Sequence, residues 1–180
     1  MKIDRLDRER IDYYLEEYNG DPDNDEDIRI EREVGERIRK NMKLSPSDLE
    51  EVIQWKYITK GARGNLKRAR EIPDGVVELI TETALKIKND EYRVNVLKTL
   101  RGVGVGTASA ILAFYDPENY GVGDTYIMDA FFSKEKTPTT REYLDILKIL
   151  REEKERHGLG ARDIEKAYYQ VYYEKYKKNG

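Results

Sequence analysis

The sequence predicts an all-α protein of about ten helices. Apolar residues recur at helical spacing through most of the 180 residues, and capping or helix-breaking residues separate these segments. No segment alternates between apolar and polar residues as a half-buried strand does. Val103 and Val105 alternate with glycine, but this stretch is too short and too rich in glycine to pair well.

Caps and breaks place the first helices. A helix over residues 4–18 is expected to end at residues 19–20, an Asn-Gly pair that tolerates the left-handed conformation of a helix end. The acidic stretch 21–27 is a linker whose carboxylates also favour the start of the second helix. Ser47 and Glu50 fit a capping box at the start of the third helix.

Glycine, proline and acidic residues divide the middle of the chain. Residues 61–64 form a basic turn interrupted by glycine, and a short basic helix continues through Arg70. Pro73 begins the next helix, and Asp90 is expected to cap the one after it. Another helix is expected over residues 107–115.

The last third contains three expected helices. Asp124 opens a helix that runs to about Phe132. Thr139 and Glu142 form a second capping box, and Gly158 ends the long helix that follows. A final helix with an apolar stripe completes the chain.

The composition excludes several kinds of site. Without cysteine, the chain has no disulfide, zinc thiolate, iron–sulfur cluster or cysteine nucleophile. The one histidine, His157, precedes a helix-ending glycine and is expected to be a polar helix-end residue, which argues against a Ser-His-Asp triad. No run approaches the roughly 20 apolar residues of a membrane span, and the N-terminus has no signal-peptide core. We therefore expect a cytoplasmic protein without membrane association.

The charge pattern permits a local contact with nucleic acid. A net charge of -3 argues against a protein that coats nucleic acid through bulk charge. A local basic cluster is nevertheless a candidate for DNA-backbone contact, and a solvated helix face is the alternative interpretation. The cluster consists of Lys56, Lys60, Arg63, Lys67, Arg68 and Arg70.

The stretch 97–131 carries the most chemical information. Gly102 and Gly104 let the chain reverse between two helices, with Val103 turned inward and Gly104 expected at positive φ near another backbone. The amides of the turn, and of the helix that starts at Gly106, then point outward and suit phosphate oxygens. A dinucleotide-binding glycine motif is rejected because a helical segment, and no strand, precedes these glycines.

This stretch resembles the helix-hairpin-helix DNA glycosylase superfamily, which includes endonuclease III and adenine glycosylase. LRGVGVGTASAIL is similar to the family's hairpin, which opens with Leu-Pro-Gly-Val-Gly. The family places a catalytic aspartate downstream, and the matching residue is Asp124 in GVGDTYIMDAF, 124 − 106 = 18 residues after Gly106. The resemblance is sharp over residues 97–131 and looser over 49–100.

Two departures from the family pattern bear on the chemistry. Arg101 stands where the hairpin usually has proline, and Gly106 stands where bifunctional members carry a lysine that forms a Schiff base. Glycine has no amine, so the resemblance implies a monofunctional enzyme that uses the aspartate and water. Members related to endonuclease III often carry a four-cysteine cluster, which this chain cannot have.

The resemblance also implies a two-lobed fold with a cleft. Residues 21–117 would form one lobe, which ends in the hairpin, and residues 1–20 with 118–180 would form the other. The expected ligand is double-stranded DNA with a damaged or mismatched base, bound by a monomer without a required cofactor. The residues expected to bind DNA are Arg101, Gly102, Val103, Gly104, Gly106, Thr107, Lys60 and Arg63.

The resemblance gives further roles near Asp124. A carboxylate there would stabilise the cationic sugar that forms as a glycosidic bond breaks, although an ordinary helix cap is the alternative role. Trp55, Lys56 and Tyr126 would line the base pocket, whereas a core tryptophan beside a solvated lysine is the plainer interpretation. The carbonyls of Leu100 and Val103 would hold a structural Na⁺ or K⁺.

Two other functions stay open from the sequence. A helix-hairpin-helix turn also occurs in proteins that bind DNA or a repair partner without catalysis. An abasic-site lyase that uses a lysine outside the hairpin, such as Lys56, is the second alternative.

Overall fold

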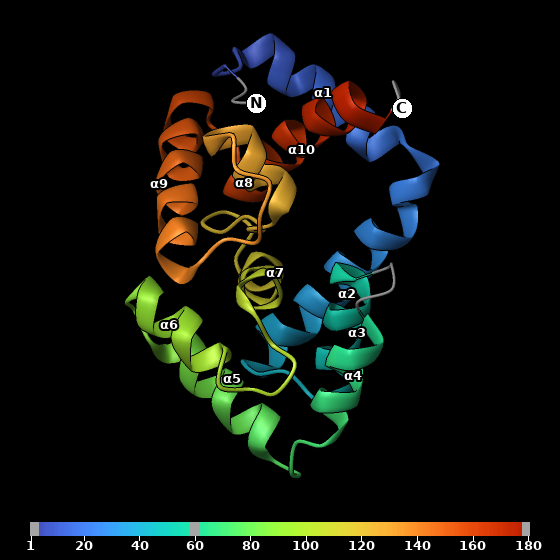
Figure 1. Cartoon of the computed structure of the whole chain (residues 1–180), viewed down its shortest axis with the longest axis vertical. Helices are drawn as coiled ribbons and strands as arrows, with labels where there is room; N and C mark the ends of the chain where they lie inside the picture. Colours follow the sequence, from blue (N-terminus) through green and yellow to red (C-terminus); the bar gives the residue numbers. More distant parts are fainter. Residues whose placement is uncertain (1–3, 58–61, 178–180) are drawn as a thin grey trace.

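The computed structural model describes residues 4–57 and 62–177 and is all-α over those ranges (Figure 1). The described chain forms ten α-helices and one 3-10 turn, η1, and contains no strand, which confirms the predicted fold class. The elements are α1 (Arg8–Gly20), η1 (Pro22–Asn24), α2 (Asp25–Asn41), α3 (Pro46–Lys56), α4 (Ala62–Arg70), α5 (Val76–Lys86), α6 (Asp90–Leu97), α7 (Val105–Tyr115), α8 (Thr125–Phe132), α9 (Thr140–His157) and α10 (Ala161–Lys177).

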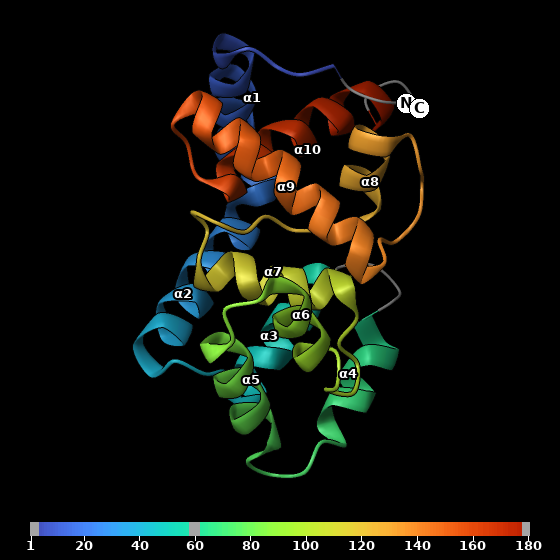
Figure 2. The same ribbon diagram turned by 90° about the vertical axis from the view of Figure 1, so that its left-hand side faces the viewer.

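The helices gather at two ends of an elongated molecule (Figure 2). Helices α1, α8, α9 and α10 lie at one end, where α10 packs against the other three. Helices α3, α4, α5 and α6 lie at the other end, as the pairs α3–α4 and α5–α6. Helix α7 lies between the two groups and packs against α2, α3 and α6.

Helix α7 is the centre of the core. Every residue from Val105 to Phe114 is buried, because this helix carries no charged side chain and is surrounded by other elements. Gly35 of α2 allows the closest approach, since a Cβ at this position would lie 2.5 Å from the carbonyl oxygen of Phe114. A side chain at position 35 would therefore push α2 away from α7.

The observed caps confirm some of the predicted helix starts and correct others. The capping box of Thr139 and Glu142 is present at α9. Helix α3 begins two residues earlier than predicted, since Ser45 is its N-cap and pairs with Asp48. Pro46 explains the shift, because proline is favoured at the first helical position. At α6 the cap is Asn89, the residue before the predicted Asp90.

A buried ionic network joins α10 to α2. Arg162 and Lys166 of α10 contact Glu31 of α2, with N–O distances of 2.9 Å and 3.2 Å, and Arg162 also pairs with Glu165. Burial raises the pKa of Glu31, but the two cations outweigh this effect and keep the pKa below its usual value. The network brings α10 close to the start of α2. Among the helices of the described ranges, none has the length and apolar character to cross a membrane.

Candidate functional site

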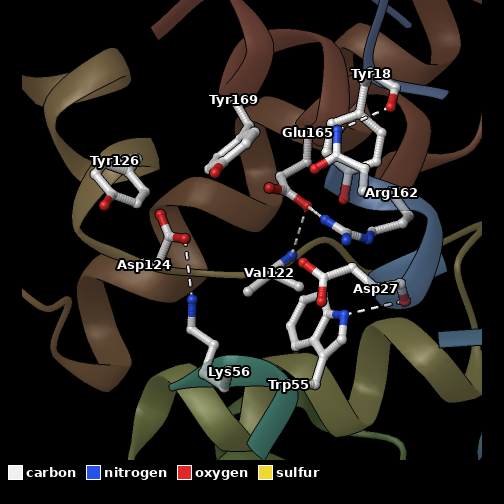
Figure 3. Close-up of a pocket in the computed structure, with 11 residues that line it drawn as sticks. Tyr18, Asp27, Trp55, Lys56, Val122, Asp124, Tyr126, Arg162, Glu165 and Tyr169 are labelled. Atoms are coloured by element: carbon white, nitrogen blue, oxygen red, sulfur yellow. Dashed lines mark hydrogen bonds and ion pairs between the residues drawn. The ribbon is translucent and has the colours of Figure 1, made fainter. Parts of the chain in front are cut away.

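A cavity of about 260 Å³ opens where α1, α2, α3, α8 and α10 meet (Figure 3). Its walls combine four aromatic rings with several charged side chains. The lining residues are Tyr18, Asn24, Asp27, Trp55, Lys56, Val122, Asp124, Tyr126, Arg162, Glu165 and Tyr169. Three residues expected at a base pocket, Trp55, Lys56 and Tyr126, therefore lie together with Asp124.

Asp124 is the N-cap of α8, as the plain interpretation of the sequence predicted. Its Oδ1 accepts a hydrogen bond of 2.9 Å from the backbone amide of Ile127. The other carboxylate oxygen, Oδ2, is directed at the pocket and Lys56 (Figure 3). Capping and a chemical role are thus compatible, because the cap uses one oxygen and fixes the direction of the other.

Three side chains hold the segment that leads to Asp124. The hydroxyl of Tyr143 donates to the carbonyl of Gly121 at 2.9 Å. The amide of Val122 donates to Glu165 at 3.3 Å, and the amide of Gly123 donates to Oγ of Ser109 at 2.9 Å. These bonds come from α9, α10 and α7, so three helices fix the backbone immediately before Asp124.

Lys56 forms an ion pair with Asp124. Its Nζ donates to Oδ2 at 3.0 Å, and the two side chains are only 12% and 15% exposed. Lys56 is the last residue of α3, whereas Asp124 precedes α8, so the pair joins the two ends of the molecule. A pair this well shielded interacts more strongly than one on an open surface.

Gly106 makes room for this lysine. A Cβ at position 106 would lie 3.1 Å from Cε of Lys56 and 3.5 Å from the carbonyl oxygen of Gly123. Ser109 ties the same region together, because its hydroxyl donates to the carbonyl of Gly106 at 2.8 Å and accepts from Gly123. The stem of Lys56 thus occupies the space that a side chain at position 106 would enter.

Trp55 is both a core residue and a wall of the pocket. It is 9% exposed, and its ring packs edge-on against Phe114 with centroids 4.9 Å apart. The guanidinium of Arg162 lies 5.4 Å from the Trp55 ring centroid. The indole Nε1 donates to the backbone carbonyl of Asp27 at 3.1 Å. Trp55 is therefore the core tryptophan of the plainer interpretation, but its neighbour Lys56 is only 12% exposed and is not solvated as that interpretation expected.

Asp27, Tyr169 and Glu165 are pocket residues that the sequence did not single out. Burial raises the pKa of Asp27 to about 6. Burial also raises the pKa of Tyr169, with a further contribution from the charge of Asp124. Asp27 lies in an acidic run that suggested only a linker and a helix start. No local pattern connects that run to residues about a hundred positions away, so the sequence offered no signal for it.

The hairpin connects α6 to α7 through residues 98–104. Val103 is buried as predicted, and its amide donates to the carbonyl of Leu100 at 3.1 Å. The left-handed residue is Gly102, with φ of 85°, and a Cβ there would lie 2.4 Å from the carbonyl oxygen of Asn65 on α4. The prediction for Gly104 is wrong, because its φ is -99° and the space around it is open.

The residues expected to bind DNA differ in their access to solvent. Arg101 is exposed and lies 3.5 Å from a carboxylate of Glu71, and Arg63 is exposed on α4. Thr107 is fully buried, so its side chain cannot contact DNA, because the first turn of α7 lies inside the core. Lys60 falls outside the described residues.

The pocket shows no cluster of metal ligands within the described ranges, where no three His, Cys, Asp or Glu side chains are placed to hold an ion. No protein-family model, curated protein or solved structure matches the chain. The function must therefore be inferred from the pocket, its ion pair and the adjoining hairpin.

Proposed function

We propose that the protein is a DNA N-glycosylase that removes a damaged or mismatched base. The observation that carries the proposal is the shielded Lys56–Asp124 pair, 3.0 Å apart, in an aromatic pocket beside a glycine hairpin. In this proposal α2 to α7 form one lobe, α1 and α8 to α10 form the other, and the pocket is the cleft between them. The loop between α6 and α7 is the helix-hairpin-helix motif.

Asp124 would act on the sugar. As the bond from C1′ to the base breaks, the base leaves with the bonding electron pair and the sugar becomes positively charged. A fixed carboxylate in a site with little water stabilises that charge. Water then adds its oxygen to C1′, and the proton it releases ends on the base. The hydrogen bond from Ile127 holds the carboxylate in place throughout, so little reorganisation is required.

The hairpin side of the cleft would hold the DNA backbone. Gly104 is exposed at the start of α7, where backbone amides attract phosphate oxygens. Arg63, Lys67 and Arg101 are exposed nearby on α4 and the hairpin, and would add charge. The carbonyl of Leu100 already accepts from Val103, but a carbonyl oxygen retains a second lone pair for the proposed Na⁺ or K⁺.

The position of Lys56 favours a second activity, abasic-site lyase. The expectation of a monofunctional enzyme depended on the missing amine at Gly106, and Lys56 brings an amine to that same space. Asp124 is placed to accept its proton. The amine attacks C1′, the base leaves with the electron pair, and ring opening gives an imine. Loss of a C2′ proton then expels the 3′ phosphate and cuts the strand.

The first test is a panel of duplexes that each carry one damaged or mismatched base, scored for base release. Asp124→Asn should bind the same DNA but lose at least about 100-fold in excision, since the charge that faces the sugar is removed. Asp7→Asn is the matched control, because Asp7 caps α1 through the same kind of bond but lies outside the pocket. Undiminished excision by Asp124→Asn, or release of no base by the wild type, contradicts the proposal.

The second test separates hydrolysis from lyase chemistry. Borohydride reduces an imine to a stable amine. In its presence, the wild type should therefore become covalently attached to DNA that contains an abasic site. Lys56→Ala should lose the adduct, and Lys86→Ala, at an exposed position of α5 outside the pocket, should keep it. Strand breaks that appear only after alkali, without an adduct, would exclude the lyase and leave the hydrolase.

A further inference from the structure

Among the charged side chains that line the pocket, the carboxylate of Asp27 is the one that bonds to no other group of the described residues. The other pocket carboxylates are satisfied within the described chain, since Asp124 bonds to Lys56 and Ile127, and Glu165 bonds to Arg162 and the amide of Val122. No hydrogen bond or ion pair engages the side chain of Asp27 in the described ranges. Figure 3 shows this carboxylate directed into the space that Lys56 and Asp124 enter from another side.

The backbone of Asp27 is fixed even though its side chain is free to bind. The indole of Trp55 donates to its carbonyl oxygen at 3.1 Å, and Asp27 lies in the first turn of α2. This anchor sets the carboxylate beside an aromatic wall. A half-buried carboxylate with no donor is energetically unfavourable, and a ligand that supplies N–H donors relieves that cost.

The proposed chemistry fixes the orientation of a base in this pocket. If C1′ of the sugar lies at Asp124 and Lys56, the base extends away from them and across the cavity. The edge of a purine farthest from its sugar is the edge used in Watson–Crick pairing. Asp27 is therefore placed to read that edge, and a carboxylate can only accept hydrogen bonds.

We propose that Asp27 selects purine lesions that keep the Watson–Crick edge of guanine, an inference that rests on the proposed glycosylase function. Guanine presents two parallel donors there, N1–H and the exocyclic amine, which match the two oxygens of a carboxylate. Adenine presents one donor, its exocyclic amine, beside a lone pair at N1 that the carboxylate repels. Hypoxanthine offers a single donor, and uracil or thymine flanks its one donor with two carbonyl oxygens.

The experiment uses three lesions that share one oxidised ring and differ only at the edge in question. Duplexes carry 8-oxoguanine, 8-oxohypoxanthine or 8-oxoadenine, opposite the same partner base, at neutral pH. Excision should be fastest for 8-oxoguanine. It should fall by about tenfold or more for 8-oxohypoxanthine, which lacks the exocyclic amine, because a site built for a hydrogen bond rejects an analogue that lacks it. It should be slowest for 8-oxoadenine, whose N1 presents a lone pair to the carboxylate in place of N1–H.

Asp27→Asn should reduce the ratio of excision between 8-oxoguanine and 8-oxoadenine by at least about tenfold, because an amide both donates and accepts. Asp25→Asn removes the same charge from the same turn at an exposed position and should leave the ratio unchanged. The ratio is the informative quantity, since a purely structural change would slow all three lesions together. In the Asp124→Asn background, binding to the three duplexes should follow the same order without any chemistry.

The outcomes separate this inference from the proposed function. If other bases are released in an Asp124-dependent manner but 8-oxoguanine is not preferred, the inference fails and the glycosylase stands. An unchanged ratio in Asp27→Asn also overturns the inference. If no base is released from any duplex, the proposed function fails and the inference fails with it.

Discussion

The hairpin and the pocket are built in different ways. The hairpin depends on backbone, since Gly102 lies against a carbonyl of α4 and Val103 bonds to Leu100. The pocket depends on side chains from five helices and the loop before α8, which meet only after the chain has folded. A motif that is continuous in sequence therefore marks where the site lies, whereas distant residues determine what the site can do.

The largest effect should come from Gly106, which belongs to both regions. Gly106→Leu would place a side chain where Cε of Lys56 now lies and would separate Lys56 from Asp124. We expect excision to fall by about 100-fold or more, because a displacement of 1 Å at a reacting group has an effect of that size. Excision by the variant at the wild-type rate would show that the ion pair has no role.

Gly104→Leu is the matched control for that experiment. Nothing lies within 4 Å of a Cβ at position 104, so the same side chain should leave the Lys56–Asp124 pair intact. It can lower excision only by weakening the proposed contact with the DNA backbone, which saturating enzyme overcomes. Measured DNA affinity and single-turnover excision rates would distinguish the two variants. Loss of excision in both variants would place the effect in the hairpin as a whole.

A smaller effect should come from Gly102, which tests the hairpin alone. Gly102→Ala imposes a positive φ on a residue with a Cβ and a contact of 2.4 Å with the carbonyl of Asn65. We expect a loss of about 2 kcal/mol in the free energy of unfolding and weaker binding to every DNA sequence. Gly104→Ala should change the free energy of unfolding by less than about 0.5 kcal/mol in urea titrations. Equal losses would contradict the corrected assignment of the left-handed residue.

The smallest effect concerns Asp27 and the pH dependence of stability. Its pKa is raised to about 6 by burial, lowered in part by Arg162 and Lys56, and raised further by Glu31 and Glu26. The folded state therefore binds this proton more tightly than the unfolded state, whose pKa is near 3.8. Protonated Asp27 therefore stabilises the folded state below about pH 4, and this contribution to the free energy of unfolding is lost as the pH rises through about 6.

Asp27→Asn should remove this part of the pH dependence. Urea titrations at pH 4 and pH 7 measure how the free energy of unfolding changes with pH. This change should be smaller in the variant than in the wild type by about 1 kcal/mol, after allowance for solvent screening. Asp25→Asn should retain the wild-type slope. A slope unchanged by Asp27→Asn would show that the carboxylate is better solvated than its position in the pocket indicates.

The sequence predicted the fold class and part of the site for identifiable reasons. Helical periodicity and the cap at Thr139 are local signals, and the structure confirms both. Asp124, Lys56 and Trp55 line one pocket, and the roles that the resemblance implied for them stay predictions. The positive φ predicted for Gly104 belongs to Gly102, because the close approach of α4, which the sequence does not reveal, occurs at Gly102.

The parts of the site that the sequence missed share one physical cause. Asp27 and Glu165 are separated from Asp124 by long stretches of chain, and their positions follow from the packing of α2 and α10. The ion pair of Lys56 with Asp124 requires the space left by the absent side chain at Gly106. From the sequence, Gly106 indicated only that the amine of a family lysine is absent at this position. That Lys56 of α3 fills the space beside Gly106 of α7 follows from helix packing, which the sequence does not show.

The position of Trp55 provides an optical signal. It is the only tryptophan in the sequence, and it lies in the pocket wall with Arg162 above its ring and Asp27 at its indole nitrogen. Its intrinsic fluorescence therefore reports on this one place in the molecule, without a label and without background from other tryptophans. A base that enters the pocket should change the intensity or wavelength of that emission, so stopped-flow fluorescence can time the arrival of the base separately from its excision.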